Sequence, residues 1–230
     1  MLLLHGFTAT PTEMQLISHY FYNNGLTVSA PLLPGHGTTP ADCNRYRWQH
    51  WANYATIALA ELQDQCSKVF VGGLSMGALL SLYLAAKVTG IQGILTYAPI
   101  IKASDRRQLL APVIKIFKRT VKKSRDQAPN REMDAIRWAY DVYPTRAAHE
   151  LLKLQVEVKR LLPDVAAPLL IVYSTADERI KTDGIDLLLK KVESSEKEVV
   201  KLKQSGHIIT LDVEWEVVAQ KSLQFIDKHR

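Results

Sequence analysis

Hydrophobic and polar positions follow two different periods along the chain. Short runs rich in apolar and β-branched residues predict strands at residues 2–4, 26–30, 68–71, 91–97, 168–173 and 198–202. Longer segments with apolar residues at helical spacing predict helices over residues 10–24, 46–65, 76–88 and 183–192, and a last helix after residue 212. Because strands and helices alternate, the pattern indicates an α/β fold with a mostly parallel sheet flanked by helices on both faces.

Residue types add detail to the first two helices. Thr10 can act as an N-cap, Pro11 fits the first helical position, and Glu13 can complete a capping box. Trp48 and Trp51 fall on the apolar face of the next helix. We expect these two side chains in the core rather than around a ligand.

The alternation stops between residues 100 and 164, a stretch too long for a loop without structure of its own. Apolar residues there recur at helical spacing and are interleaved with lysine and arginine. We therefore expect a basic helical cap inserted over the carboxyl edge of the sheet. The predicted domains are a core of residues 1–99 and 165–230 and a cap of residues 100–164.

Composition and charge change this picture little. With 230 residues, 47% of them hydrophobic, the chain suits one well-buried domain that carries an insertion. The net charge is +6, but nine lysines and arginines stand between residues 102 and 125, so the excess belongs to the cap. A solvated helix face explains this run better than a nucleic-acid site, while peripheral contact with a lipid surface stays open.

Targeting and redox signals are weak. No apolar run approaches the roughly 20 residues needed to cross a bilayer, and the N-terminus lacks the features of a signal peptide. We expect a soluble, cytoplasmic protein without stable membrane insertion. Cys43 and Cys66 have no metal-ligand spacing, so free thiols are expected and neither a disulfide framework nor a zinc site has support.

The segment Gly73-Leu74-Ser75-Met76-Gly77 has the form G-x-S-x-G, the nucleophile elbow that exposes a serine hydroxyl above a sheet. By chance alone, about one chain in ten of this length would contain such a pattern. Its position between a predicted strand and a predicted helix makes the assignment much stronger. Gly72 to Gly77 matches neither the dinucleotide fingerprint nor the phosphate loop.

Two further residues follow predicted strands at the edge where ligands bind in parallel sheets: Asp177 and His207. With Ser75 they stand in the order serine, acid, histidine. A serine hydroxyl needs a base to become a nucleophile, a histidine can take and return the proton, and a carboxylate fixes the histidine's tautomer. Glu178 or Asp183 could replace Asp177 as the acid.

The other histidines fit the role of base less well. His5 and His36 look like residues that brace loops, and the remaining ones fall in helices, in the cap or at the chain end, namely His19, His50, His149 and His229. The tetrahedral intermediate would also need two donors for its oxyanion. The backbone N–H groups of Phe7 and Met76 are the candidates.

Several motifs together resemble the bacterial carboxylesterase and monoacylglycerol lipase-like branch of the α/β-hydrolases. They are His5-Gly6-Phe7-Thr8, Pro34-Gly35-His36-Gly37, Gly73-Leu74-Ser75-Met76-Gly77, Ala176-Asp177-Glu178 and Ser205-Gly206-His207. The resemblance implies the α/β-hydrolase fold, nucleophile Ser75, acid Asp177 and base His207, with Phe7 and Met76 as oxyanion donors. It also implies hydrolysis of short-to-medium acyl esters through an acyl-enzyme intermediate, without a metal or cofactor.

One departure from this resemblance concerns the start of the sheet. Strand residues before the His5-Gly6-Phe7 motif are almost absent, so we expect the N-terminal strands to be truncated. An exposed edge strand would favour association, which leaves the choice between monomer and homodimer open.

The substrate is less constrained than the catalytic chemistry. Apolar cap residues would suit an alkyl chain, and the candidates are Ile114, Phe117, Ile136 and Trp138. Thioester hydrolysis, acyl transfer and carbon–carbon bond hydrolysis remain alternatives on the same three residues, because fold and triad do not fix the substrate. A non-catalytic binding module with a basic cap is a further alternative.

Overall fold

The computed structural model describes residues 1–102, 115, 118–123 and 135–230 of the chain. Its centre is a five-stranded sheet in the order β1-β2-β3-β6-β7. The strands are β1 (Leu2–Leu4), β2 (Val69–Leu74), β3 (Ile91–Tyr97), β6 (Leu169–Ser174) and β7 (Lys197–Leu202). Each neighbouring pair is parallel, so the carboxyl ends of all these strands meet at one edge.

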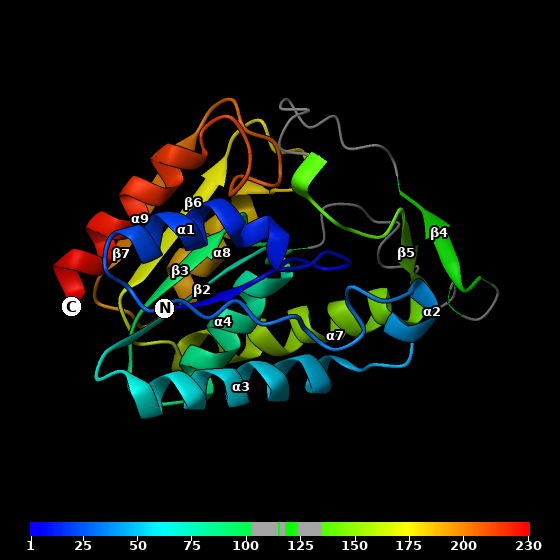
Figure 1. Ribbon diagram of the computed structural model, residues 1–230, viewed down its shortest axis with the longest axis horizontal. Coiled ribbons are helices and arrows are strands. Elements are labelled where there is room, and N and C mark those ends of the chain that lie inside the picture. The colour runs from blue at the N-terminus through cyan, green and yellow to red at the C-terminus, as the bar shows by residue number, and fades with distance from the viewer. Residues whose placement is uncertain (103–114, 116–117, 124–134) are drawn as a thin grey trace.

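Helices cover both faces of the sheet (Figure 1). One face carries α1 (Gln15–Asn23) and α9 (Trp215–His229), and the other carries α3 (Trp48–Gln65), α4 (Met76–Lys87), α7 (Thr145–Leu161) and α8 (Thr182–Lys191). Each face of the sheet has its own apolar core. Within β1, Leu3 packs into the core under α1 and α9, and Leu2 and Leu4 pack into the core on the opposite face, because successive strand residues point to opposite faces. The predicted α/β fold class is confirmed.

The tryptophans lie where the helical spacing predicts. Trp51 is fully buried, and Trp48 packs half-buried against Tyr83 with the ring centroids 5.6 Å apart. Trp51 also contacts the rings of Phe7 and His36, and both tryptophans belong to the apolar core on the α3 side of the sheet.

The strand predicted at residues 26–30 is wrong. This segment runs beside β1 but makes a single parallel bridge, between Ser29 and Leu2. Ser29 donates to the Met1 carbonyl at 2.9 Å and accepts from the Leu3 N–H at 2.8 Å. The ladder stops there because Pro31, two residues on, has no N–H to donate. The segment nevertheless covers the outer edge of β1, whose side chains are fully buried.

The start of the first helix also differs from the prediction. Residues Pro11–Met14 form a short 3-10 helix, η1, before α1 begins. Thr10 is extended and its side chain does not cap the helix. The Glu13 carboxylate does not close a capping box either, because it accepts the N–H of Gly6 in the loop after β1.

The described residues between β3 and β6 contain an antiparallel pair of strands, β4 (Thr120–Lys122) and β5 (Val142–Pro144), followed by α7. A cap made of helices alone is therefore wrong, although the helix predicted around Leu154 and Val158 is present as α7. The helix predicted around Trp138 is wrong in part: residues 135 and 136 are helical, but Ala139 forms an antiparallel bridge with Ala9, and this tertiary pairing overrides local propensity. The domain boundaries at residues 99 and 165 stay a prediction.

Candidate active site

Ser75 lies where β2 ends and α4 begins. Its φ of 56° and ψ of −106° are costly for any residue but glycine, and such a conformation persists only where its surroundings enforce it. A Cβ at Gly77 would overlap the Leu4 carbonyl oxygen, and one at Gly73 would overlap the backbone of Gly77. The Ser75 N–H donates to the Tyr97 carbonyl at 2.8 Å and ties the turn to β3. The sharp strand–turn–helix that the motif predicts is present.

This turn leaves the serine accessible. Ser75 is partly exposed, whereas Leu74 and Met76 on either side are buried. Met76 occupies the first position of α4, where no carbonyl of the helix can accept its N–H. An accessible hydroxyl therefore stands next to a backbone donor that the helix leaves unpaired.

The loop after β1 packs against the turn and contains the second predicted donor, Phe7. The Phe7 ring stacks on that of Tyr143, with centroids 6.3 Å apart and an interplanar angle of 3°, and also contacts Trp51. In the described part of the chain, the Phe7 N–H donates no backbone hydrogen bond. Thr8, the next residue, has a φ of 68°, which is uncommon for a β-branched residue.

Asp177 and His207 form a buried hydrogen-bonded pair. Asp177 Oδ2 lies 2.6 Å from His207 Nδ1, and Asp177 Oδ1 accepts the Arg179 N–H at 2.9 Å. Burial alone would raise the pKa of Asp177, but the hydrogen bond and charge of His207 and the Arg179 N–H outweigh it and hold this pKa below its usual value. The ionised carboxylate favours the imidazole tautomer with its proton on Nδ1, which leaves a lone pair on Nε2.

His207 Nε2 is the ring nitrogen that a catalytic base would use. It is buried, and no residue in the described ranges makes a hydrogen bond to it. Of the two alternative acids, Glu178 is exposed and Asp183 is paired with Lys102 at 2.7 Å on the surface of α8. Asp177 is therefore the one of these three carboxylates that contacts the histidine.

The loop that carries His207 is braced on both sides. The Glu214 carboxylate accepts the Ser205 N–H at 2.8 Å, and the Asp212 carboxylate accepts the Gly206 N–H at 2.6 Å. Thr210 Oγ1 donates to the Glu13 carbonyl at 2.6 Å, so this loop lies beside η1. The loops after β1, β2, β6 and β7 thus meet at the carboxyl edge of the sheet.

His5 and His36 brace loops, as their positions predict. His5 Nε2 accepts the Leu33 N–H at 3.1 Å while Nδ1 lies 2.9 Å from the Gly6 carbonyl, and His36 Nδ1 lies 3.2 Å from the Pro34 carbonyl. Burial lowers the pKa of His5 to about 4 and that of His36 to about 3. Both rings are neutral at physiological pH.

Of the predicted acyl-chain residues, Ile114 and Phe117 lie outside the described residues. Ile136 and Trp138 are 40% and 43% exposed and belong to the segment that runs along the loop after β1. The Trp138 N–H donates to Thr12 Oγ1 at 3.0 Å, and its ring meets that of Tyr140 edge-on at 5.3 Å. Their role in acyl-chain binding stays a prediction.

Sequence reasoning missed three polar residues around the loop after β1. Glu13 accepts the Gly6 N–H at 3.0 Å and pairs with Arg137 Nε at 2.8 Å, and Lys123 Nζ donates to Thr8 Oγ1 at 2.6 Å. The contacts of Arg137 with Glu13 and of Lys123 with Thr8 join residues more than 100 positions apart, so no local spacing indicates them. In the sequence, Glu13 stands out only as a candidate for a capping box.

A family model described as serine aminopeptidase, S33, matches residues 1–214. The chain belongs to this family of α/β-hydrolases. A thermostable monoacylglycerol lipase of Bacillus sp. (strain H-257) is 32% identical over 229 residues, which cover 100% of this chain and 90% of that protein. A carboxylesterase of Bacillus subtilis (strain 168) is 25% identical over 229 residues and is covered to 92%.

Solved structures of lipolytic enzymes show the same fold. One described with two metagenome-derived lipolytic enzymes, LipS and LipT, has a TM-score of 0.93 at 29% identity, covering 99% of this chain and 93% of that one. The monoacylglycerol lipase of Paleococcus ferrophilus has a TM-score of 0.83 at 20% identity, covering 100% and 94%. These likenesses confirm the α/β-hydrolase fold.

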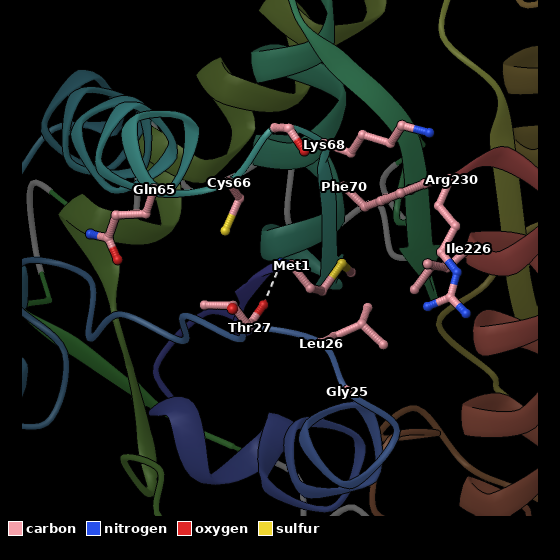
Figure 2. Close-up of a pocket in the computed structure, with 11 residues that line it drawn as sticks. Met1, Gly25, Leu26, Thr27, Gln65, Cys66, Lys68, Phe70, Ile226 and Arg230 are labelled. Carbon is pink, nitrogen blue, oxygen red and sulfur yellow. Dashed lines mark hydrogen bonds between the residues drawn. The ribbon is translucent and has the colours of Figure 1, made fainter.

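A separate pocket of about 480 Å³ lies at the opposite edge of the sheet (Figure 2). Met1 and Phe70, at the starts of β1 and β2, line it together with Cys66 and with Ile226 and Arg230 from the end of the chain. None of the predicted site residues takes part. In the described ranges, no helix is long and apolar enough to span a bilayer, and no cluster of three metal-ligating side chains occurs.

Proposed function

We propose that this S33-family hydrolase is a serine carboxylesterase that cleaves short-to-medium-chain carboxylic esters, monoacylglycerols included. Its nucleophile is Ser75, its base His207 and its acid Asp177. The observation that carries the proposal is the buried Asp177–His207 pair, 2.6 Å apart, at the sheet edge where the strained Ser75 turn lies. The two relatives matched over the whole chain, a monoacylglycerol lipase and a carboxylesterase, support ester hydrolysis.

The chemistry follows from these positions. His207 Nε2 removes the proton of Ser75 Oγ as this oxygen attacks the ester carbonyl. The resulting oxyanion accepts hydrogen bonds from the Phe7 and Met76 N–H groups. As the C–O bond to the alcohol breaks, protonated His207 returns the proton to the leaving oxygen. A water molecule, activated by the same nitrogen, then hydrolyses the acyl-enzyme and releases the acid. No metal or cofactor is needed.

The segment of residues 100–164 acts as the cap that selects the acyl chain in this proposal. Ile136 and Trp138, both exposed, provide apolar surface for the alkyl chain in this proposal, with Ile114 and Phe117 as further candidates. Truncating Ile136 and Trp138 to alanine should shift the preferred chain length, and an unchanged chain-length profile would remove their assignment.

The test is hydrolysis of p-nitrophenyl esters from acetyl to palmitoyl, and of a monoacylglycerol, by the wild type and Ser75→Ala. We expect activity that peaks at short or medium chains and falls about 10⁴-fold or more in the variant. Ser195→Ala, at an exposed serine, is the matched control and should retain full activity. A folded wild type that cleaves no ester, or a Ser75→Ala protein as active as the wild type, would refute the proposal.

The same panel includes an acyl thioester and an aminoacyl p-nitroanilide, since the family description is that of an aminopeptidase. A kcat/KM for either that exceeds those of all the esters would reassign the substrate while keeping the nucleophile. Loss of that activity in Ser75→Ala would separate this outcome from a non-catalytic protein.

A further inference from the structure

Glu13 is a buried carboxylate that the proposed mechanism does not use. Its side chain is 2% exposed, and its two oxygens have different partners. Oε2 accepts the Gly6 N–H at 3.0 Å, and Oε1 accepts Arg137 Nε at 2.8 Å. A buried carboxylate is costly unless it is paired and hydrogen-bonded, and here both conditions are met.

The partner Gly6 immediately precedes Phe7, the proposed oxyanion donor. A Cβ added at Gly6 would lie 2.7 Å from Glu13 Oε2, so glycine allows the carboxylate to approach the backbone. The hydrogen bond holds the His5–Gly6 peptide, to which the Gly6 N–H belongs. The next peptide, Gly6–Phe7, carries the Phe7 N–H and starts from the same Gly6. Thr8, with its φ of 68°, shows that the loop holds a costly conformation that its surroundings must enforce.

Glu13 also connects the loop to two other parts of the site. Its backbone carbonyl accepts Thr210 Oγ1 at 2.6 Å, three residues after His207. Arg137 stands at the start of a segment that continues along the loop, where the Tyr140 N–H donates to the Thr8 carbonyl at 2.9 Å. The segment that begins at Arg137, the loop after β1 and the loop that carries His207 therefore all contact Glu13.

We propose that Glu13 is a positioning residue, whose carboxylate, paired with Arg137, orients the Gly6–Phe7 peptide so that the Phe7 N–H meets the oxyanion. This proposal rests on the proposed function. A charge-assisted hydrogen bond restricts the loop more than a neutral one, so the pair reduces the reorganisation needed when the oxyanion forms. Binding of the uncharged ester depends on it much less than the chemical step does.

The experiment compares wild type, Glu13→Gln, Arg137→Gln and Arg137→Lys with p-nitrophenyl butyrate. All rates are expressed per active site titrated with a fluorophosphonate, so that unfolded protein does not contribute. We expect Glu13→Gln to lower kcat about 10- to 100-fold, less than the loss of an oxyanion donor itself, with KM within about 3-fold of wild type. The affinity for a trifluoromethyl ketone, which forms a tetrahedral oxyanion on the serine, should fall by a similar factor.

Arg137 should act through Glu13. Arg137→Lys, which keeps the charge, should lose less kcat than Arg137→Gln, and the double variant Glu13→Gln/Arg137→Gln should lose no more than Glu13→Gln alone. Glu157→Gln is the matched control, because Glu157 pairs with Arg160 at 2.6 Å on α7 away from the loop. Its kcat should stay within about 2-fold of wild type.

The outcomes separate this proposal from the one on which it rests. A wild type that hydrolyses no ester refutes the proposed function. An active wild type with an unchanged kcat per titrated site in Glu13→Gln overturns the positioning role and leaves the proposed function intact. Should Glu13→Gln fail to fold, the two Arg137 variants decide in the same way, and a kcat equal to wild type in both overturns the proposal.

Discussion

Asp177 is the residue whose environment says most about the proposed chemistry. His207 and the Arg179 N–H hold its pKa below the usual value despite burial, which favours the ionised carboxylate. We predict that Asp177→Asn lowers kcat/KM about 10³- to 10⁴-fold, because an amide that donates to Nδ1 favours the wrong imidazole tautomer. The measurement is kcat/KM for p-nitrophenyl butyrate between pH 5 and 9.

In that pH series the wild type should lose activity in acid, since a protonated His207 cannot accept the serine proton. Asp183→Asn is the control, because this exposed carboxylate pairs with Lys102 and does not contact the histidine. A larger loss in Asp183→Asn than in Asp177→Asn would assign the acid to α8 instead.

The sequence alone identifies some residues of the candidate site and not others. Ser75, Asp177 and His207 could be selected because each follows an apolar strand, and parallel strands bring their carboxyl ends together. The ion pair between Glu13 and Arg137 could not, because it joins residues 124 positions apart through a fold that no local pattern specifies. Local spacing even favoured a different partner for Glu13, the helix that it begins.

At the scale of elements, the N-terminus of α7 is capped by a side chain from a distant part of the sequence, Asn44. Pro144 stands at its N-cap without a capping side chain, and Asn44 Oδ1 accepts the Arg146 and Ala147 N–H groups at 2.9 and 3.1 Å. We predict that Asn44→Ala lowers the free energy of unfolding by about 1–2 kcal/mol, as the loss of a cap does, and leaves kcat unchanged.

Urea denaturation of both proteins measures this effect, with Asn23→Ala at an exposed position of α1 as the control. The control should change the free energy of unfolding by less than about 0.5 kcal/mol. An equal, small effect of the two substitutions would show that α7 does not need the tertiary cap.

The elements themselves were predictable where periodicity and burial agree. Strand β3 begins and ends at the predicted residues, and α3, α4 and α8 differ from their predictions by one or two. Prediction failed where tertiary pairing decides the backbone: beside β1, where Ser29 makes one bridge, and at Ala139, which pairs with Ala9. A pairing partner that is distant in the sequence leaves no mark on the local hydrophobic pattern.

On the scale of the whole molecule, one parallel sheet separates two environments. The loops at its carboxyl edge hold the accessible serine, the Asp177–His207 pair and the buried Glu13, while the amino edge holds the pocket around Met1 (Figures 1 and 2). The polar groups of the site are buried in an otherwise apolar fold, so the stability of the molecule should depend on their protonation.

His5 and His36 dominate that dependence in mildly acidic solution. Their rings lie 5.0 Å apart, and burial lowers the pKa values to about 4 and about 3, so the folded protein keeps both neutral. The unfolded chain binds a proton at each below about pH 6.5. Between that pH and about 4, the unfolded state therefore holds two more protons than the folded state.

We predict that the free energy of unfolding falls with decreasing pH in this window, by about 1.4 kcal/mol per pH unit for each of the two histidines, and is fully restored above about pH 7. Urea denaturation at pH 7.5, 6.5, 5.5 and 4.5 measures the slope. His36→Gln removes one titrating group, so its slope should be smaller than that of the wild type by about 1.4 kcal/mol per pH unit, even though lost contacts lower its stability at every pH. His19→Gln, at an exposed position of α1, should keep the wild-type slope. Equal slopes in His36→Gln and the wild type would mean that the His36 imidazole takes up its proton without global unfolding. The loops after β1 and around His36 would then have to open locally in acid.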